Sequence, residues 1–346
     1  MTDRVASALA ASLSKHAFRP AWWARSGLLQ TIASMRAGDP APALELEVWP
    51  TPDGDEVRLH FAAASDPAAP IVLLLHGLEG SRHSGYVGSA ARHAAARGWR
   101  LVVLEFRSCG GVLNRTLRTY HSGETRDLEL VVAGLAARWP SAPLCLIGYS
   151  LGANVALKWL GESGDRVPAS VFGAAAVSPP FDLAVCARQC DTRYGGAITR
   201  LFLRTLIPKA MAKARQFPGV IDADAVRSCR SFRRFDDLVT APTHGFRDAE
   251  HYYRTQSCRY YLPAIRRPTL LLAAADDPLC RPELLPHEAV AASPFLVPQF
   301  SARGGHIGFV EGGTPWRPRR WAEGQAMRFF DTLLGAGASA SARVTG

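Results

Sequence analysis

Short apolar runs, separated by segments of helical length, constrain the fold of this chain more than any other feature. They cover residues 71–75, 101–106, 144–147, 171–177 and 270–274. A strand that is apolar at every position is buried on both faces, which is typical of a mostly parallel sheet covered by helices. The covering helices are expected at residues 81–97, 123–138 and 150–161. The pattern therefore predicts the α/β class, with a mostly parallel central sheet flanked by helices.

The alternation of strands and helices is interrupted once. After Ser178-Pro179-Pro180, about 80 residues of helical, basic sequence follow before strand character returns at Thr269. Two alternating segments, 44–49 and 57–61, predict an antiparallel entry to the sheet around a Pro-Asp-Gly turn. We therefore predict an N-terminal helical segment at 1–40, a core at 41–183 and 263–335, a helical cap insertion at 184–262, and a disordered tail at 336–346.

The sequence Gly148-Tyr149-Ser150-Leu151-Gly152 joins a predicted strand to a predicted helix. In that context the GxSxG pattern predicts a sharp turn that exposes a nucleophilic serine. The glycines leave room for the strained serine backbone, and the following helix directs its N-terminal N–H groups towards developing negative charge. Ser150 is therefore the candidate nucleophile.

A serine hydroxyl needs a base within hydrogen-bond reach and a carboxylate that orients the base. In proteins whose nucleophile is a GxSxG serine on a strand-to-helix turn, the three residues follow one another in the chain in the order serine, acid, histidine. Asp276 and Asp277 follow the predicted strand at 270–274, and we favour Asp277 because a Pro-Leu step comes directly after it. The other carboxylate then caps the next helix. His306 is the candidate base, because it lies late in the chain among glycines after the apolar run at 295–297.

Two backbone N–H groups are needed to stabilise the oxyanion of a tetrahedral intermediate. We assign one to Leu151, directly after the nucleophile, and one to Leu78 in the glycine-flanked turn at 76–80. His76 is interpreted as a structural residue that holds this turn. His244 precedes the acid in the chain and so fits the expected order poorly.

At these residues the chain resembles the YheT-like branch of the α/β-hydrolases, the AB hydrolase 4 family. The resemblance extends from about residue 20 to 334 and is most specific in the cap, at Asp236–Thr240, Gly245-Phe246 and Tyr252-Tyr253. Further matching segments are Leu28-Leu29-Gln30-Thr31-Ile32, His76–Ser81, Arg118–Gly123, Gly148–Asn154 and Ala275–Pro278. It implies an α/β-hydrolase fold and activity on carboxylic esters, from short-chain esters to acylglycerols and phospholipids.

The resulting hypothesis is a serine hydrolase that cleaves carboxylic esters through an acyl-enzyme, with a small-molecule ester or lipid as substrate. Two alternatives stay open: an acyltransferase that uses the same triad, and a non-catalytic binding module on a hydrolase scaffold. No metal and no cofactor are expected. The seven cysteines contain no CxxC pair and are interpreted as reduced thiols, which favours a cytoplasmic protein.

The net charge of +10 is concentrated in the predicted cap, where residues 184–234 hold eleven basic and three acidic side chains. Nucleic-acid binding is not predicted, because the basic residues are mostly arginines and form no tract with interleaved aromatics. Two interpretations of the cap stay open, a solvated basic face and a weak peripheral contact with an anionic membrane. The first is favoured because single amphipathic helices are common.

Overall fold

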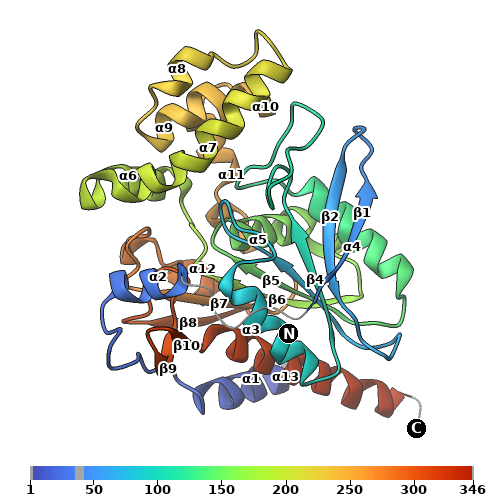
Figure 1. Cartoon of the computed structure of the whole chain (residues 1–346). Coiled ribbons are helices and arrows are strands. Elements are labelled where there is room, and N and C mark those ends of the chain that lie inside the picture. The colour runs from blue at the N-terminus through green and yellow to red at the C-terminus, as the bar shows by residue number, and fades with distance from the viewer. Residues whose placement is uncertain (1–2, 36–42, 345–346) are drawn as a thin grey trace.

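The computed structural model describes residues 3–35 and 43–344, and it contains a central sheet with the order β1-β2-β4-β3-β5-β6-β7-β8 (Figure 1). From β4 to β8 all neighbouring strands are parallel, whereas β2 is antiparallel to both β1 and β4. The strands are β1 Glu45–Pro50, β2 Glu56–Ala62, β3 Ile71–Leu75, β4 Arg100–Glu105, β5 Leu144–Tyr149, β6 Val171–Val177, β7 Thr269–Ala274 and β8 Leu296–Ser301. The predicted α/β class with an antiparallel entry is confirmed.

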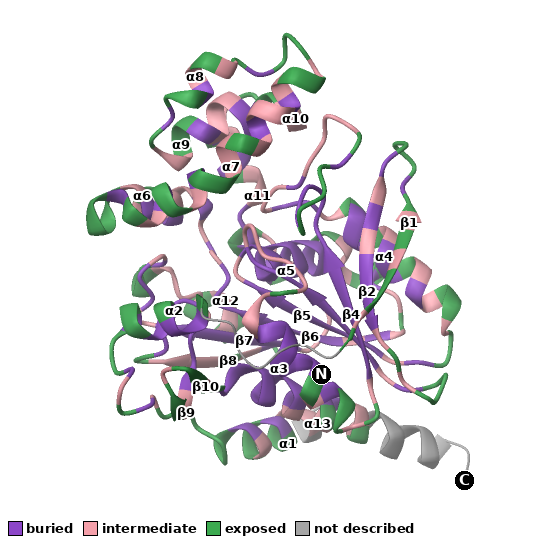
Figure 2. Ribbon diagram, in the orientation of Figure 1, coloured by how far each residue is buried: buried purple, intermediate pink, exposed green. Residues whose placement is uncertain are grey.

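Helices cover both faces of the sheet, so the strands between them are buried (Figure 2). One apolar cluster joins the strands to α4 (Arg126–Arg138) and α5 (Leu151–Ser163). A second cluster, on the other face, joins them to α1 (Asp3–Ser14), α3 (Gly85–Ala95) and α13 (Ala322–Val344). Each β3 side chain is buried, as expected for a strand with helices on both sides.

Between β6 and β7 the chain leaves the sheet and forms a group of helices above the carboxyl ends of the strands (Figure 1). These elements are α6 Leu183–Thr192, α7 Ala197–Gln216, α8 Ala223–Arg227, α9 Phe232–Phe235, a π-helical turn at Asp236–Thr240, α10 Ala241–His244 and α11 Ala249–Gln256. We call this group the cap. It has its own apolar cluster, which includes Leu203, Ile221, Val226 and Phe235.

Two lysines of the cap point towards the core rather than into solvent. Lys213 is 1% exposed, and its Nζ donates to the backbone oxygens of Asn114, at 2.6 Å, and Thr116, at 2.5 Å. Lys209 Nζ lies 2.7 Å from a carboxylate oxygen of Glu79. A solvated basic face therefore describes only part of α7, because two of its cations bind loops of the core.

The ends of the chain differ in part from the prediction. Two helices, α1 and α2 (Gly27–Met35), lie within the segment 1–40, while residues 1–2 and 36–42 lie outside the described residues. A short hairpin of β9 (Val310–Thr314) and β10 (Arg317–Arg320) precedes α13, and the sequence pattern did not predict it. Helix α13 is assigned to Val344, and the disordered tail at 336–346 stays a prediction.

Helix α12 (His287–Ala292) connects the loop after β7 to β8. Within the described ranges, no helix combines the length and the apolarity that a membrane crossing requires.

Candidate active site

Ser150 lies in the sharp turn between β5 and α5. Its backbone has φ +50° and ψ −115°, a left-handed conformation that is strained for a residue with a side chain. The flanking glycines are required by packing: a Cβ added at Gly148 would lie 2.5 Å from the Gly152 oxygen, and one at Gly152 would lie 2.4 Å from the Leu75 oxygen. The turn therefore projects the serine hydroxyl beyond the carboxyl end of β5, at the N-terminus of α5.

His306 connects Ser150 to Asp277 through two hydrogen bonds. Its Nε2 lies 2.8 Å from Ser150 Oγ, and its Nδ1 lies 2.8 Å from Asp277 Oδ2. Asp277 Oδ1 accepts the backbone N–H groups of Leu279, at 2.7 Å, and Cys280, at 3.2 Å, so the carboxylate is held in place from both sides. The structure thus brings the three predicted side chains, 127 and 29 residues apart in sequence, into one chain of contacts.

The loop that carries His306 is fixed by residues from distant parts of the chain. Thr31 Oγ1 of α2 accepts the His306 backbone N–H at 2.9 Å and donates to the Gly27 oxygen at 2.7 Å. Ser178 Oγ, at the end of β6, accepts the Ile307 N–H at 3.0 Å. No sequence pattern predicts a role for either residue, although Thr31 lies in one of the segments on which the family resemblance rests.

Asp276 has a different partner from Asp277. Its Oδ1 accepts the backbone N–H of Gly305 at 2.9 Å, and burial raises the pKa of its carboxyl group. The expectation that this residue caps the following helix is wrong. Asp276 holds the histidine loop instead. The N–H groups of Leu279 and Cys280 donate to the Asp277 carboxylate, so no helix that Asp276 could cap begins directly after it.

The predicted oxyanion donors lie beside Ser150. A Cβ added at Gly77, directly before Leu78, would lie 3.4 Å from the Ser150 Cβ. Gly77 N–H donates to the Tyr86 hydroxyl and Glu79 N–H to the Tyr120 hydroxyl, each at 2.9 Å. The Leu78 N–H between them has no acceptor among the residues that the structure describes. It is therefore available to a bound group in the cavity that Leu78, Leu151 and Ser150 line together.

His76 holds this turn from inside the core. Its Nδ1 contacts the Gly77 oxygen at 2.8 Å, and its Nε2 accepts the Phe106 backbone N–H at 3.1 Å. Burial lowers the pKa of His76 to about 4, so the imidazole is neutral and accepts through Nε2. These contacts agree with the structural interpretation of this histidine.

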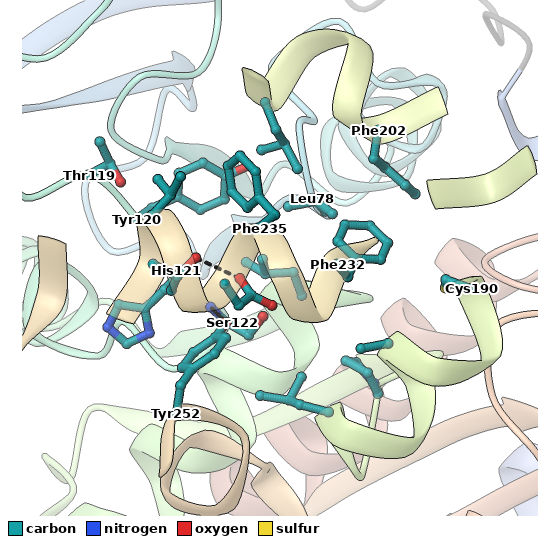
Figure 3. Close-up of a pocket in the computed structure, with 18 of the residues that line it drawn as sticks. Leu78, Thr119, Tyr120, His121, Ser122, Cys190, Phe202, Phe232, Phe235 and Tyr252 are labelled. Atoms are coloured by element: carbon teal, nitrogen blue, oxygen red, sulfur yellow. Dashed lines mark hydrogen bonds between the residues drawn. The ribbon is translucent and has the colours of Figure 1, made fainter. Parts of the chain in front are cut away.

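A cavity of about 1200 Å³, counted with its open mouth, lies between the cap and the carboxyl ends of the strands. Ser150 and His306 lie in its wall. The cap side is mostly apolar, and Figure 3 shows Phe202 of α7 and Phe232 and Phe235 of α9 around the same space. Other apolar side chains in the lining are Leu206, Ile221 and Val239.

A buried carboxyl group, Asp236, also lines the cavity. It accepts hydrogen bonds from Thr240 Oγ1 and the Tyr253 hydroxyl, both at 2.6 Å. Burial raises the pKa of Asp236 to about 7, despite these two bonds. The cap therefore holds a carboxyl group that is mostly protonated below about pH 7.

His121, Glu124 and His244, near the cavity, lie close enough together to be considered as metal ligands. The rings of His121 and His244 are 4.6 Å apart between centroids. However, the Arg118 guanidinium lies 3.0 Å from one Glu124 oxygen and 2.5 Å from the other. The guanidinium binds both carboxylate oxygens, and its positive charge disfavours binding of a metal cation at the same place.

Comparison with known proteins identifies the family. A family profile described as Hydrolase_4 (serine aminopeptidase, S33) matches residues 66–293. The chain is 38% identical over 291 residues to the putative esterase YheT of Escherichia coli, covering 82% of this chain and 84% of that protein. It is 31% identical over 277 residues to phospholipase ABHD3 of Mus musculus, covering 78% and 67%. Monoacylglycerol lipase of Saccharomyces cerevisiae is 30% identical over 275 residues, covering 77% and 60%.

Among solved structures, the Pyrococcus furiosus esterase Pf2001 is similar, with a TM-score of 0.51 at 16% identity over 79% of this chain and 90% of that one. At this identity the likeness shows the fold alone. The sequence matches also show the family, since they span most of the chain at 30% identity or more. The chain belongs to the Hydrolase_4 family of α/β-hydrolases, in its YheT-like branch, and is an esterase- and lipase-like hydrolase.

Proposed function

We propose that this protein hydrolyses carboxylic esters with an apolar acyl group, with Ser150 as nucleophile, His306 as base and Asp277 as the carboxylate that orients the base. The observation that carries the proposal is the chain of two 2.8 Å contacts from Ser150 through His306 to Asp277, at the wall of a cavity with an apolar cap side. The names of the relatives, esterase, phospholipase and monoacylglycerol lipase, agree with this substrate class.

In the proposed reaction, His306 Nε2 takes the Ser150 proton as Oγ attacks the ester carbonyl. Asp277 accepts from Nδ1–H, which holds the imidazole with its Nε2 lone pair facing the serine. The N–H groups of Leu78 and Leu151 stabilise the tetrahedral oxyanion. His306 then gives its proton to the departing alcohol, and a water activated by the same imidazole releases the acid from Ser150.

The apolar cap side predicts which part of the substrate lies there. Phenylalanine and leucine side chains of α7 and α9 provide surface for a hydrocarbon chain, and burial of each methylene stabilises binding by about 0.8 kcal/mol. We therefore expect turnover at low substrate concentration to rise with acyl length until the cavity is filled.

The test is a series of p-nitrophenyl esters and monoacylglycerols of increasing chain length, with the purified protein and its Ser150→Ala variant. Hydrolysis by the parent protein, lost in the variant, supports the proposal, and equal turnover by both would overturn the role of Ser150. An aminoacyl p-nitroanilide tests the aminopeptidase activity in the family description. Faster cleavage of this amide than of every ester would overturn the substrate class.

Adding an alcohol as a competing acceptor separates hydrolysis from acyl transfer. Release of free acid as the main product is the expected result. Predominant formation of the new ester at low alcohol concentration would contradict hydrolysis while keeping the same nucleophile.

A further inference from the structure

Three cysteine thiols lie together where the cap meets the loop that carries Asp277. Cys186 and Cys190 are one turn apart on α6, and Cys280 follows β7 in the core. The sulfur atoms of Cys186 and Cys280 are 3.1 Å apart, although the two residues are separated by 94 positions in the sequence. All three thiols line the cavity, and Figure 3 shows Cys190 at its edge. Their arrangement is a product of tertiary structure, since no sequence spacing indicates it.

One further contact joins the same two elements, and a second contact fixes the loop itself. Arg281 Nε, directly after Cys280, donates to Gln189 Oε1 of α6 at 3.3 Å. The Cys280 N–H is fixed on Asp277 Oδ1 at 3.2 Å. The two sulfurs therefore need to approach by only about 1 Å to reach the length of a disulfide bond, which is roughly 2 Å.

We propose that Cys186 and Cys280 form a reversible disulfide that ties cap helix α6 to the acid loop and slows ester hydrolysis. The oxidant is a peroxide, which the surroundings supply. One thiol sulfur takes an oxygen atom from hydrogen peroxide and becomes a sulfenic acid, with release of one water. The second sulfur attacks the first, and the hydroxide that leaves takes up the thiol proton as a second water. Two thiols and one peroxide thus give one disulfide and two waters, and a dithiol reverses the cross-link.

The effect on hydrolysis follows from where the bond lies. A covalent link from α6 to the loop of Asp277 holds one side of the cap against the core, so the cavity loses the freedom to widen for a bulky substrate. Long-chain esters should therefore be slowed more than acetate esters. This part rests on the proposed ester hydrolysis, whereas formation of the disulfide is independent of it.

In the reduced protein the thiols are buried and protonated, so we expect the disulfide to form slowly. The hydrogen bond with Cys186, together with burial, raises the pKa of the Cys280 thiol. Because the thiolate is the reactive form, oxidation requires peroxide in excess and a long incubation.

The first measurement needs no activity. The reduced protein is incubated with hydrogen peroxide, remaining thiols are alkylated, and peptides are mapped by mass spectrometry with and without prior reduction. The expected product is a peptide pair that joins Cys186 to Cys280, lighter by two hydrogen atoms. Peroxide treatment that yields no such pair, or yields only sulfinic and sulfonic acids at these positions, overturns the proposal.

The second measurement follows esterase activity during the same treatment. Parent protein should lose about tenfold in long-chain ester turnover and recover it with dithiothreitol. Cys186→Ser and Cys280→Ser should each show the same turnover before and after peroxide, whatever the basal turnover of each variant, while Cys190→Ser, the matched control in the same cluster, should lose turnover in peroxide like the parent. Either single variant suffices if the other fails to fold. A cross-linked protein with unchanged turnover would overturn the regulatory effect, and a parent protein inactive on every ester would refute the proposed function while leaving the mapped disulfide intact.

Discussion

Asp276 and Asp277 are neighbours in the chain, yet their carboxylates bind different parts of the site. Asp277 contacts the His306 ring, whereas Asp276 accepts the Gly305 backbone N–H. Asp277 bonds to the imidazole ring and so affects which nitrogen carries the proton, whereas Asp276 bonds to the backbone and so affects only the position of the loop. Substituting each aspartate by asparagine therefore distinguishes the two roles.

We predict that Asp277→Asn lowers kcat/KM for ester hydrolysis by roughly three to four orders of magnitude, because an amide no longer holds the productive imidazole tautomer. Asp276→Asn, the matched control, should lose less than about tenfold, since its amide oxygen still accepts the Gly305 N–H. Steady-state kinetics with a p-nitrophenyl ester checks both. A larger loss in Asp276→Asn would reverse the assignment.

Asp236 gives the cap a pH-dependent stability. Its pKa is raised to about 7 in the folded protein, so folding favours the protonated form. The stabilisation from this group is present below the pKa of an unfolded aspartate and is lost as pH rises through the folded value. We predict that the unfolding free energy of the parent protein falls by about 2 kcal/mol relative to Asp236→Asn between pH 5 and pH 8.

Urea unfolding of both proteins at the two pH values measures this difference. The asparagine keeps the size of the side chain and is neutral throughout, so other titrating groups cancel in the comparison. A difference between the two proteins that does not change with pH would contradict a raised pKa at this position.

At the level of elements, helix α2 supports the histidine loop although the two are far apart in sequence. Thr31 binds the His306 N–H, and Gln30 Oε1 accepts the Val310 N–H at 2.7 Å. Gln30 is fully buried, which is unusual for an amide side chain unless its hydrogen bonds are satisfied. Thus the amino-terminal segment completes the site by positioning a loop rather than by reaching the cavity.

We predict that Thr31→Val lowers kcat by about tenfold with little change in KM, as expected for a residue that positions a catalytic loop. Valine has the same shape and cannot accept the His306 N–H. The conservative variant Thr31→Ser should restore most of the activity. Equal activity of the valine and parent proteins would show that α2 has no positioning role.

At the scale of the whole molecule, the cap is joined to the core by buried polar contacts as well as by chain connections. Lys213 Nζ binds two backbone oxygens of the loop at 114–116, and burial lowers its pKa. Lys209 binds Glu79, next to Leu78 in the predicted oxyanion loop. The position of α7 is therefore coupled to the loop that faces Ser150.

We predict that Lys213→Met lowers the unfolding free energy by about 2 kcal/mol, because it removes the Lys213 donor from the oxygen of buried Asn114 and leaves the Thr116 oxygen with Asn114 Nδ2 as its remaining donor. Hydrogen exchange should speed up in α7. The exposed Arg204 on the same helix gives the matched control, and Arg204→Met should change neither property. If both variants unfold alike, Lys213 does not anchor the cap.

The sheet, its covering helices and the turn at Ser150 could be predicted from the amino-acid sequence, because apolar periodicity and glycine sterics act over a few neighbouring residues. Chain order also pointed to Asp277 and His306, and family resemblance to the hydrolase class. Four features became visible only in the folded protein: the partner of Asp276, the support of the His306 loop by Thr31 and Ser178, the burial of Lys213 and the contact of Cys186 with Cys280. Each of these joins side chains that are distant in sequence, and such contacts form only when several elements pack at once, so no local pattern encodes them.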